Sequence, residues 1–126
     1  PVAMMAGLST LKRVKAKFNY ERMDKLVKKF CQSIRNEAKK KNIPIQINQI
    51  GTMFTLFFTE TPVVNYFTAM QSDQKKYAAF FHALLRRGVY MPPSQFEAAF
   101  VSSAHTSKVM AKVEQAFIEA LSEVCL

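Results

Sequence analysis

Apolar residues recur with two different periods along this chain. Between residues 2 and 41 they return every three or four positions, which is the spacing of one face of a helix. We expect two helices here, near 2–17 and 19–41, with Asn19 as the N-cap of the second. The second helix has the clearer apolar stripe, formed by Met23, Leu26, Val27, Phe30 and Ile34.

The first of these helices starts with residues that are almost all apolar or small. Its apolar positions are Met4, Leu8, Leu11 and Val14, and basic residues join them only from Lys12 onward. A helix that is apolar around its whole circumference is usually buried. We therefore expect a part of the protein outside this chain to cover the segment 1–11.

The period changes to two after residue 42, where isoleucine alternates with other residues from Ile43 to Ile47. A β-branched and aromatic run follows Gly51. We expect these two segments, near 43–50 and 52–58, to be antiparallel strands that meet at Gly51 in a hairpin or a bulge. A third strand is expected near 98–103, and residues 59–70 are expected to form a loop with one helical turn.

Two more helices are expected, near 73–87 and 106–124. The first is capped by Ser72 or Asp73 and ended by Gly88, and its apolar stripe is Tyr77, Phe80, Phe81, Leu84 and Leu85. Thr106 caps the second, whose stripe is Val109, Val113, Ala116, Phe117, Ala120, Leu121 and Val124. The order of elements predicts an α+β fold, a two-layer sandwich with a small, mostly antiparallel sheet of about three strands and helices on one face.

Composition agrees with a packed protein. A chain of 126 residues, 49% of them hydrophobic, is expected to form a single domain, 1–126, with a core of its own. No segment approaches the roughly 18 apolar residues that span a membrane. Cys31 and Cys125 have neither metal-ligand spacing nor a disulfide framework, which is typical of a reducing, intracellular environment. The segment 1–8 lacks the basic start of a signal peptide and an initiator methionine, so we expect that the chain was either processed or cut from a longer one.

The net charge of +9 is concentrated in one part of the chain. Twelve of the 18 lysines and arginines lie between Lys12 and Lys41, and the rest of the chain is balanced. Such a basic helical face is either a solvated surface or a binding surface for nucleic acid or an acidic partner. Nucleic acid is the less favoured partner because no aromatic residues alternate with these lysines to stack on bases.

The sequence contains no complete catalytic or metal-binding constellation. It lacks phosphate-loop, HExxH and GxSxG motifs, and it lacks paired metal ligands. His82 falls within the stripe 80–85 and is expected to pack there, whereas His105 is expected to orient the backbone at a helix start. Cys31 is expected to be a small core residue.

Glu97 is the one candidate site residue. It follows the rigid pair Pro92-Pro93 in the segment between Gly88, where a helix stops, and the third predicted strand. Loops held by such a scaffold often carry binding and catalytic groups. Two interpretations are open at this stage, a solvated loop residue or one member of a site.

Three segments resemble a known family. Phe80–Phe100, which includes the run Pro92-Pro93-Ser94-Gln95-Phe96-Glu97, closely resembles the C-terminal region of the glutamate-1-semialdehyde 2,1-aminomutases. Gly51–Phe58 is similar too, although Thr52 stands where that family more often has serine, and Pro1–Leu8 is similar to the start of a helix that leads into the small domain. The Pro-Pro-Ser-Gln-Phe-Glu run separates this family from other class III aminotransferases.

The resemblance implies a pyridoxal-phosphate enzyme that converts glutamate 1-semialdehyde to 5-aminolevulinate in tetrapyrrole synthesis. It implies a homodimer with the type I aminotransferase fold, in bacterial cytoplasm or plastid stroma, in which this chain is the C-terminal small domain. The Schiff-base lysine, the acid at the pyridine nitrogen and the phosphate ligands belong to the large domain, so the chain alone is expected to be inactive and to bind no cofactor. Glu97 alone carries over, as a residue that lines the substrate pocket, with Ser94 and Gln95 supporting its loop.

Two other hypotheses remain beside this one. The chain is an independent basic α+β module that binds nucleic acid or an acidic partner, or it is a structural domain that only dimerises. The first predicts salt-dependent binding of nucleic acid. The second predicts oligomers that form through the apolar surface.

Overall fold

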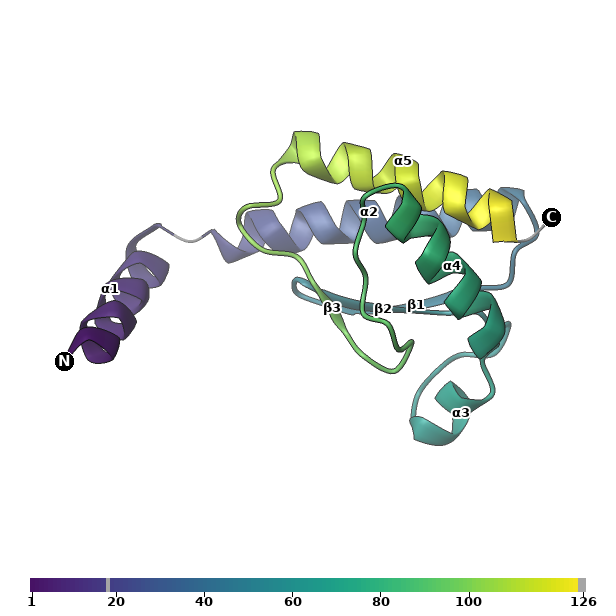
Figure 1. Cartoon of the computed structure of the whole chain (residues 1–126), viewed down its shortest axis with the longest axis horizontal. Helices are drawn as coiled ribbons and strands as arrows, with labels where there is room; N and C mark the ends of the chain where they lie inside the picture. Colours follow the sequence, from purple (N-terminus) through teal and green to yellow (C-terminus); the bar gives the residue numbers. More distant parts are fainter. Residues whose placement is uncertain (18, 125–126) are drawn as a thin grey trace.

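The computed structural model describes residues 1–17 and 19–124, and it has two layers (Figure 1). Three long helices lie over one face of a three-stranded antiparallel sheet, and a short helix lies on the other side of the sheet. The helices over the sheet are α2 (Tyr20–Lys40), α4 (Gln74–Arg86) and α5 (Ser107–Val124). The sheet has the order β1 (Gln46–Ile50), β2 (Met53–Phe57), β3 (Ala99–Phe100), and the short helix is α3 (Tyr66–Met70). The predicted α+β fold is confirmed.

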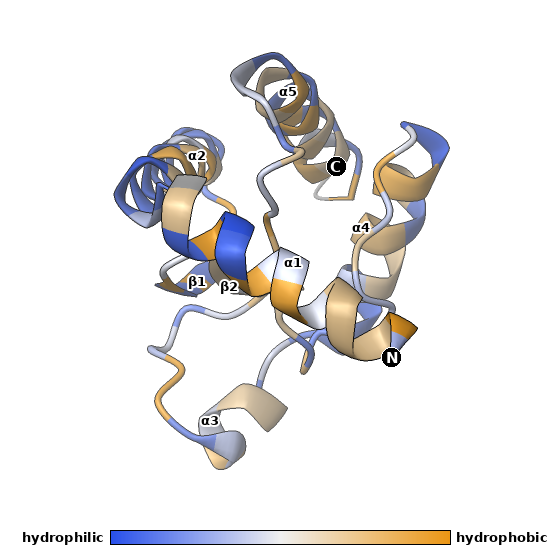
Figure 2. Cartoon of the chain, turned by 90° about the vertical axis from the view of Figure 1, so that its left-hand side faces the viewer, coloured by the Kyte–Doolittle hydropathy of each residue, from blue (hydrophilic) through white to orange (hydrophobic). Residues whose placement is uncertain are grey.

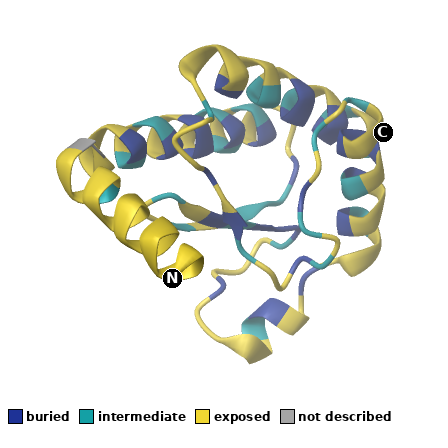
Figure 3. Ribbon diagram, turned by 60° about the vertical axis from the view of Figure 1, so that its left-hand side comes forward, coloured by how far each residue is buried: buried dark blue, intermediate teal, exposed yellow. Residues whose placement is uncertain are grey.

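The N-terminal helix α1 (Val2–Lys17) projects from this body beside the start of α2 (Figure 1). Every residue from Pro1 to Arg13 is exposed. Figure 3 shows this exposure along the helix, in contrast to the buried inner faces of α2 and α5. The predicted chain break beside Asn19 involves Phe18, which lies outside the described residues.

The predicted helix caps are confirmed. The side chains of Asn19 and Asp73 accept hydrogen bonds from the backbone N–H groups three residues later, at 2.8 and 2.9 Å. Thr106 accepts from the N–H of Val109 at 3.3 Å. Gly88 has a φ of 76°, a left-handed conformation that glycine adopts without a Cβ clash, and α4 ends two residues before it.

The strands are shorter than the sequence predicts, for two physical reasons. Ile43 donates its N–H back to Ala38, so the chain is still completing the end of α2 at that point, and β1 begins only at Gln46. The third strand, β3, stops at Phe100, and beyond it one further hydrogen bond runs from the N–H of Val101 to the carbonyl of Thr52. A tight turn around His105 then leads into α5.

The β1–β2 connection is a hairpin rather than a bulge. Ile50 pairs directly with Met53, and the turn is made by Gly51 and Thr52, with Gly51 at a φ of 55°. Each of the remaining residues of β1 also has one partner on β2. An unbroken register fixes which side chains face the helices, because neighbouring side chains on a strand point to opposite faces.

The core between sheet and helices is built on aromatic rings. Phe117 of α5 contacts Phe30 of α2 and Phe80 of α4 edge to face, with ring centroids 5.1 and 5.3 Å apart. Phe54 of β2 joins them at 5.5 Å from Phe30. Edge-to-face pairs of this kind add about 0.5–1.5 kcal/mol beyond the apolar area that they bury. This cluster ties three helices to the centre of the sheet.

Some of the predicted core positions are wrong. His82 is exposed rather than packed in the core, and its ring touches only the edge of Phe81 among the ring contacts of the described residues. Leu85 and Val109 are also exposed, and Met110 is buried in place of Val109. The buried face of α4 is centred on Tyr77, Phe80 and Leu84, which turns position 82 to the opposite side of the helix.

Candidate functional site

The loop that carries Glu97 is anchored to α4. After Gly88 the chain passes through Pro92 and Pro93 without regular secondary structure, and the Tyr77 hydroxyl donates a hydrogen bond to the carbonyl of Pro92 at 2.7 Å. The ring of Tyr77 is buried in the core. Neither proline has a backbone N–H that could hold the loop through a hydrogen bond. The start of the loop is therefore held through the Pro92 carbonyl, by the buried side chain of Tyr77.

The backbone at Glu97 is held from two sides. Its N–H donates to the carbonyl of Ser94 at 3.2 Å, and its carbonyl accepts from the Thr55 hydroxyl on β2 at 3.4 Å. Ser94 also accepts from the N–H of Phe96 through its hydroxyl at 3.2 Å. The carboxylate of Glu97 itself remains exposed. The loop thus presents a charge at a defined place without using it for packing.

Gln95 lies next to this charge but is buried, with 2% of its surface exposed. Neither atom of its side-chain amide has a hydrogen-bond partner among the described residues. The supporting role predicted for Ser94 and Gln95 stays a prediction, although the contacts of Ser94 are those of a loop-forming residue.

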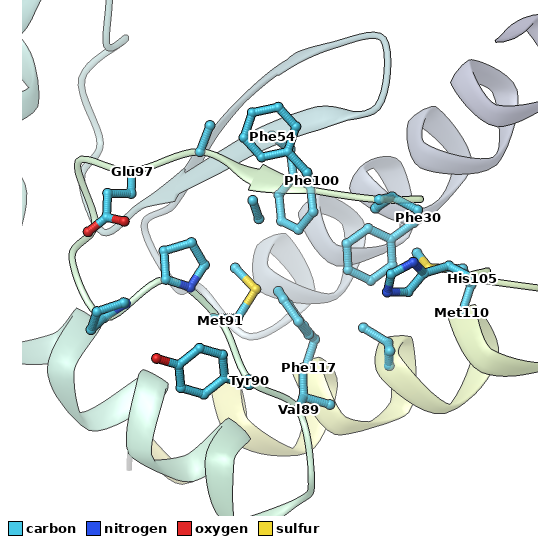
Figure 4. A pocket seen from close by; sticks show the side chains of 16 residues that line it. Phe30, Phe54, Val89, Tyr90, Met91, Glu97, Phe100, His105, Met110 and Phe117 are labelled. Atoms are coloured by element: carbon cyan, nitrogen blue, oxygen red, sulfur yellow. The ribbon is translucent and has the colours of Figure 1, made fainter. Parts of the chain in front are cut away.

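Glu97 lies at the rim of a pocket of about 440 Å³ (Figure 4). The pocket wall is mostly aromatic and aliphatic, and it is formed by α2, β2, β3, α5 and the loop after α4. Figure 4 shows the carboxylate of Glu97 at one end, directed away from Phe30 and Phe117. A pocket with mostly apolar walls and a few polar groups suits a small organic molecule.

His105 lines the same pocket at the end opposite Glu97 (Figure 4). Its Nδ1 accepts a hydrogen bond from the N–H of Ser102 at 3.0 Å, which confirms the predicted role in orienting the backbone. The Ser102 hydroxyl also lies 3.0 Å from this atom. The side chain of His105 therefore stabilises the turn before α5.

Electrostatics at the site centre on Tyr77. Burial raises the pKa of its hydroxyl to about 12, and the negative charge of Glu97 adds to this rise. Tyr77 therefore stays protonated at neutral pH and keeps its hydrogen bond to Pro92. Sequence reasoning placed Tyr77 only in an apolar stripe. A buried tyrosine hydroxyl needs a hydrogen-bond partner, and this requirement was the signal in the sequence that could have predicted a contact between Tyr77 and a neighbouring loop.

The pocket does not suit a phosphorylated cofactor by itself. Among its lining residues there is no lysine or arginine, and Glu97 and His105 are its only ionisable side chains apart from Tyr90. In the described part of the chain, no group of three or more His, Cys, Asp or Glu residues is placed to hold a metal ion.

Other features of the described residues also bear on function. None of the described helices combines the length and apolar character that a membrane span requires. The basic face of α2 is partly neutralised by three ion pairs within the helix: Lys25 with Glu21, Lys28 with Asp24, and Lys40 with Glu37. Cys31 is buried, and burial raises its pKa to about 11, so it is a core thiol; Cys125 lies outside the described residues.

Comparison with known proteins gives clear sequence relatives. No family model matches the chain. It is 44% identical over 123 residues to glutamate-1-semialdehyde 2,1-aminomutase 2 of Brevibacillus brevis, and 38% identical over 124 residues to the glutamate-1-semialdehyde 2,1-aminomutase of Roseiflexus castenholzii. Each alignment covers 98% of this chain and 29% of the relative. The comparisons give no support to an independent basic binding module.

Solved structures show the same fold inside longer chains. An omega-transaminase from Sphaerobacter thermophilus matches all of this chain with a TM-score of 0.81 at 18% identity, over 28% of its own length. The FumI protein of Sphingopyxis sp. MTA144, solved in its pyridoxal-phosphate internal aldimine form, matches 97% of the chain with a TM-score of 0.76 at 20% identity, over 27% of its own length. Over nearly its whole length the chain is therefore a homologue of the glutamate-1-semialdehyde 2,1-aminomutases, and it spans about 29% of the length of these relatives.

Proposed function

We propose that this chain is the C-terminal small domain of a pyridoxal-phosphate-dependent aminomutase that converts glutamate 1-semialdehyde to 5-aminolevulinate in tetrapyrrole synthesis. The observation that carries the proposal is the 44% identity to the Brevibacillus brevis aminomutase over 98% of this chain. The share of that relative left unmatched is large enough for a cofactor-binding domain. We also propose that the whole enzyme is a cytoplasmic homodimer.

Glu97 is the residue of this chain that we propose to bind the substrate. Its carboxylate is exposed at the rim of an apolar pocket, and its backbone is held by Ser94 and Thr55. A carboxylate accepts hydrogen bonds, so Glu97 binds a donor group of the substrate and orients it. Its contribution is to position the substrate, with the apolar wall excluding water beside it.

The covalent chemistry belongs to residues outside this chain. Pyridoxal phosphate supplies a conjugated ring that accepts electrons from the reacting carbon, and it needs a lysine and phosphate ligands around it. The pocket in this chain has no lysine or arginine in its wall. We therefore expect the isolated chain to be inactive.

A fusion protein tests the proposal directly. In the Brevibacillus brevis aminomutase, the segment that matches this chain is replaced by residues 1–126. The fusion is expected to form 5-aminolevulinate at a rate within about tenfold of the parent enzyme, a barrier change of about 1.4 kcal/mol. A fusion that folds and binds cofactor but forms no product above background would contradict the proposal.

The role of Glu97 is tested in the same fusion. Glu97→Gln keeps the shape and removes the charge, and it is expected to lower kcat/KM by about 10- to 100-fold, equivalent to one charged hydrogen bond of about 1.5–3 kcal/mol. Glu60→Gln is the matched control, because Glu60 is also an exposed loop glutamate and lies outside the pocket. Equal kinetics for the two variants would remove Glu97 from the substrate site.

A further inference from the structure

Gln95 carries the one buried side-chain amide in the described part of the chain that makes no hydrogen bond. Neither its nitrogen nor its oxygen has a partner among the described residues, and neither atom exposes surface that a water molecule could contact. Ser72, which is also buried and polar, donates its hydroxyl to the carbonyl of Ala69. A buried amide without partners destabilises the arrangement that buries it.

The turn that buries this amide is held by long hydrogen bonds. Gln95 and Phe96 are its central residues, and a bond of 3.2 Å from the Glu97 N–H to the Ser94 carbonyl closes it. The Phe96 N–H donates to the Ser94 hydroxyl, also at 3.2 Å. The Thr55 hydroxyl lies 3.4 Å from the Glu97 carbonyl. Hydrogen bonds of these kinds are usually about 3.0 Å long or shorter, so these contacts stabilise the turn 94–97 only weakly.

Apart from Gln95, no side chain ties the turn to the core. Gln95 is the only buried residue between Pro92 and Ala98. Phe96 is 42% exposed, and its ring contacts Tyr66 of α3, which is exposed as well. Figure 2 shows α3 apart from the three long helices, on the other side of the strands. The segment is therefore anchored inward mainly by a side chain whose burial is unfavourable.

The two ends of the segment are fixed, in contrast. At one end the buried Tyr77 donates its hydroxyl to the Pro92 carbonyl at 2.7 Å. At the other end Ala99 is buried and pairs with Phe54 in the sheet. Residues 93–98 can therefore rearrange while the core and the sheet stay as they are.

We propose that Gln95 is a positioning residue for Glu97. When the substrate binds, the turn 94–97 rearranges, the Gln95 amide leaves its buried place to form hydrogen bonds at the pocket rim, and the Glu97 carboxylate moves over the pocket. In the present arrangement this carboxylate is directed away from Phe30 and Phe117 (Figure 4). The inference rests on the proposed function, which makes Glu97 the substrate-binding residue.

The unpaired amide lowers the free-energy cost of this rearrangement. An amide side chain has two N–H donors and one oxygen acceptor, and all of them gain partners once Gln95 leaves the interior. A substrate that binds only the rearranged turn selects it, and the apparent affinity falls with the fraction of protein in that arrangement. Gln95 thus raises the fraction of the protein that is ready to bind substrate.

The first test measures the stability of the 126-residue chain. Gln95→Met replaces the amide by an apolar side chain of similar length, and we expect the equilibrium constant for unfolding to fall at least about fivefold in urea denaturation. Gln71→Met is the matched control, because Gln71 is exposed and its side chain has no hydrogen bond to a described residue. The control is expected to stay within about twofold of the wild type.

The second test measures the kinetics of the fusion protein. Gln95→Met stabilises the arrangement that does not bind substrate, so we expect KM to rise by at least the factor by which the unfolding constant falls. We expect kcat to stay within about twofold of the parent fusion, since the rearranged turn is the same once substrate is bound. A side chain with only a structural role would not raise KM while it makes the protein more stable.

The two measurements separate this inference from the proposed function. A Gln95→Met chain that is no more stable than the wild type would show that the amide is satisfied in the folded chain, and it would overturn the inference. An unchanged KM in a folded, active Gln95→Met fusion would overturn it as well. A fusion with Gln95 intact that forms no product counts against the proposed function, and the urea measurement still decides whether burial of the amide is unfavourable.

Discussion

The two faces of the sheet differ in how far their apolar side chains are buried. On the helix side, Phe54 packs against Phe30 and Phe117, and the buried side chains of this face share one core cluster with side chains from α2, α4 and α5. On the other side, Phe57 is covered by the α3 segment, while Ile50 and Phe100 are exposed. Both faces carry large apolar side chains, so hydrophobicity alone does not distinguish them.

The difference between the two faces shows which apolar side chains are buried by residues of this chain and which are not. A face whose apolar side chains are already packed contributes to the stability of this chain. A face whose apolar side chains are exposed contributes little until something else covers it, and large exposed apolar patches commonly mark interaction sites. The candidate pocket lies where these two regions meet, with Phe54 and Phe100 both in its wall.

Phe54 and its neighbour Met53 on β2 point to opposite faces of the sheet, so substituting each of them tests this contrast directly. Phe54→Ala removes a buried ring from the helix side, and we expect it to lower the free energy of unfolding of the 126-residue chain by about 3–5 kcal/mol. Urea denaturation followed by far-ultraviolet circular dichroism measures this loss. A change below about 1.5 kcal/mol would show that the aromatic cluster is not the core of the fold.

The loop anchor has an intermediate effect. Tyr77→Phe removes the hydrogen bond to the Pro92 carbonyl, and we expect a loss of about 1 kcal/mol at pH 7 in the same urea assay. Tyr90→Phe is the control, because Tyr90 is exposed. A loss as small for Tyr77→Phe as for Tyr90→Phe would mean that the hydroxyl does not fix the loop.

The pH dependence of the same variant provides a second test. The pKa of Tyr77 is raised to about 12 in the folded chain, so its stabilising contribution is complete below its unfolded value of about 10 and is lost as the pH rises to 12. The wild type should therefore lose more stability than Tyr77→Phe between pH 10 and 12. Parallel curves for the two proteins would contradict the raised pKa.

The smallest change in stability is expected at Met53, on the face of the sheet that the three long helices do not cover. Met53→Ala, one residue from Phe54 and on the other face, should change the free energy of unfolding of the 126-residue chain by about 0.5 kcal/mol or less, since Met53 is 36% exposed and its cross-strand neighbours Ile50 and Phe100 are exposed too. The comparison of the two faces fails if Met53→Ala costs as much as Phe54→Ala. Urea denaturation of the two variants side by side decides this.

Much of the fold follows from local patterns in the sequence. Helical and strand periodicity, together with Asn19, Asp73 and Gly88 as caps and stop, predicted the order of elements that the structure shows. Strand ends were predicted less well, because the return of Ile43 to Ala38 and the turn around His105 are made by local hydrogen bonds that the apolar periodicity of the sequence does not reveal. The exposure of His82 was missed because a stripe drawn over the sequence does not fix the rotation of a helix against its neighbours.

The candidate site was predictable only in part. Glu97 was singled out by the glycine stop and the two prolines around it, and the structure places it at the rim of a pocket. The contribution of Tyr77 and Thr55, which hold the loop, was not predicted, because each comes from a different element and both belong to regular patterns there. The pocket wall from α2 and α5 likewise exists only once these helices pack together.

The central claim is that this chain forms one wall of an active site whose reacting groups lie on another part of the polypeptide. The most direct measurement is borohydride reduction after incubation with pyridoxal phosphate, performed on the isolated 126-residue chain and on the fusion protein. We predict no stoichiometric pyridoxyl-lysine adduct and no 5-aminolevulinate from the chain alone, and both from the fusion. A single trapped lysine in the isolated chain, accompanied by product formation, would contradict the account.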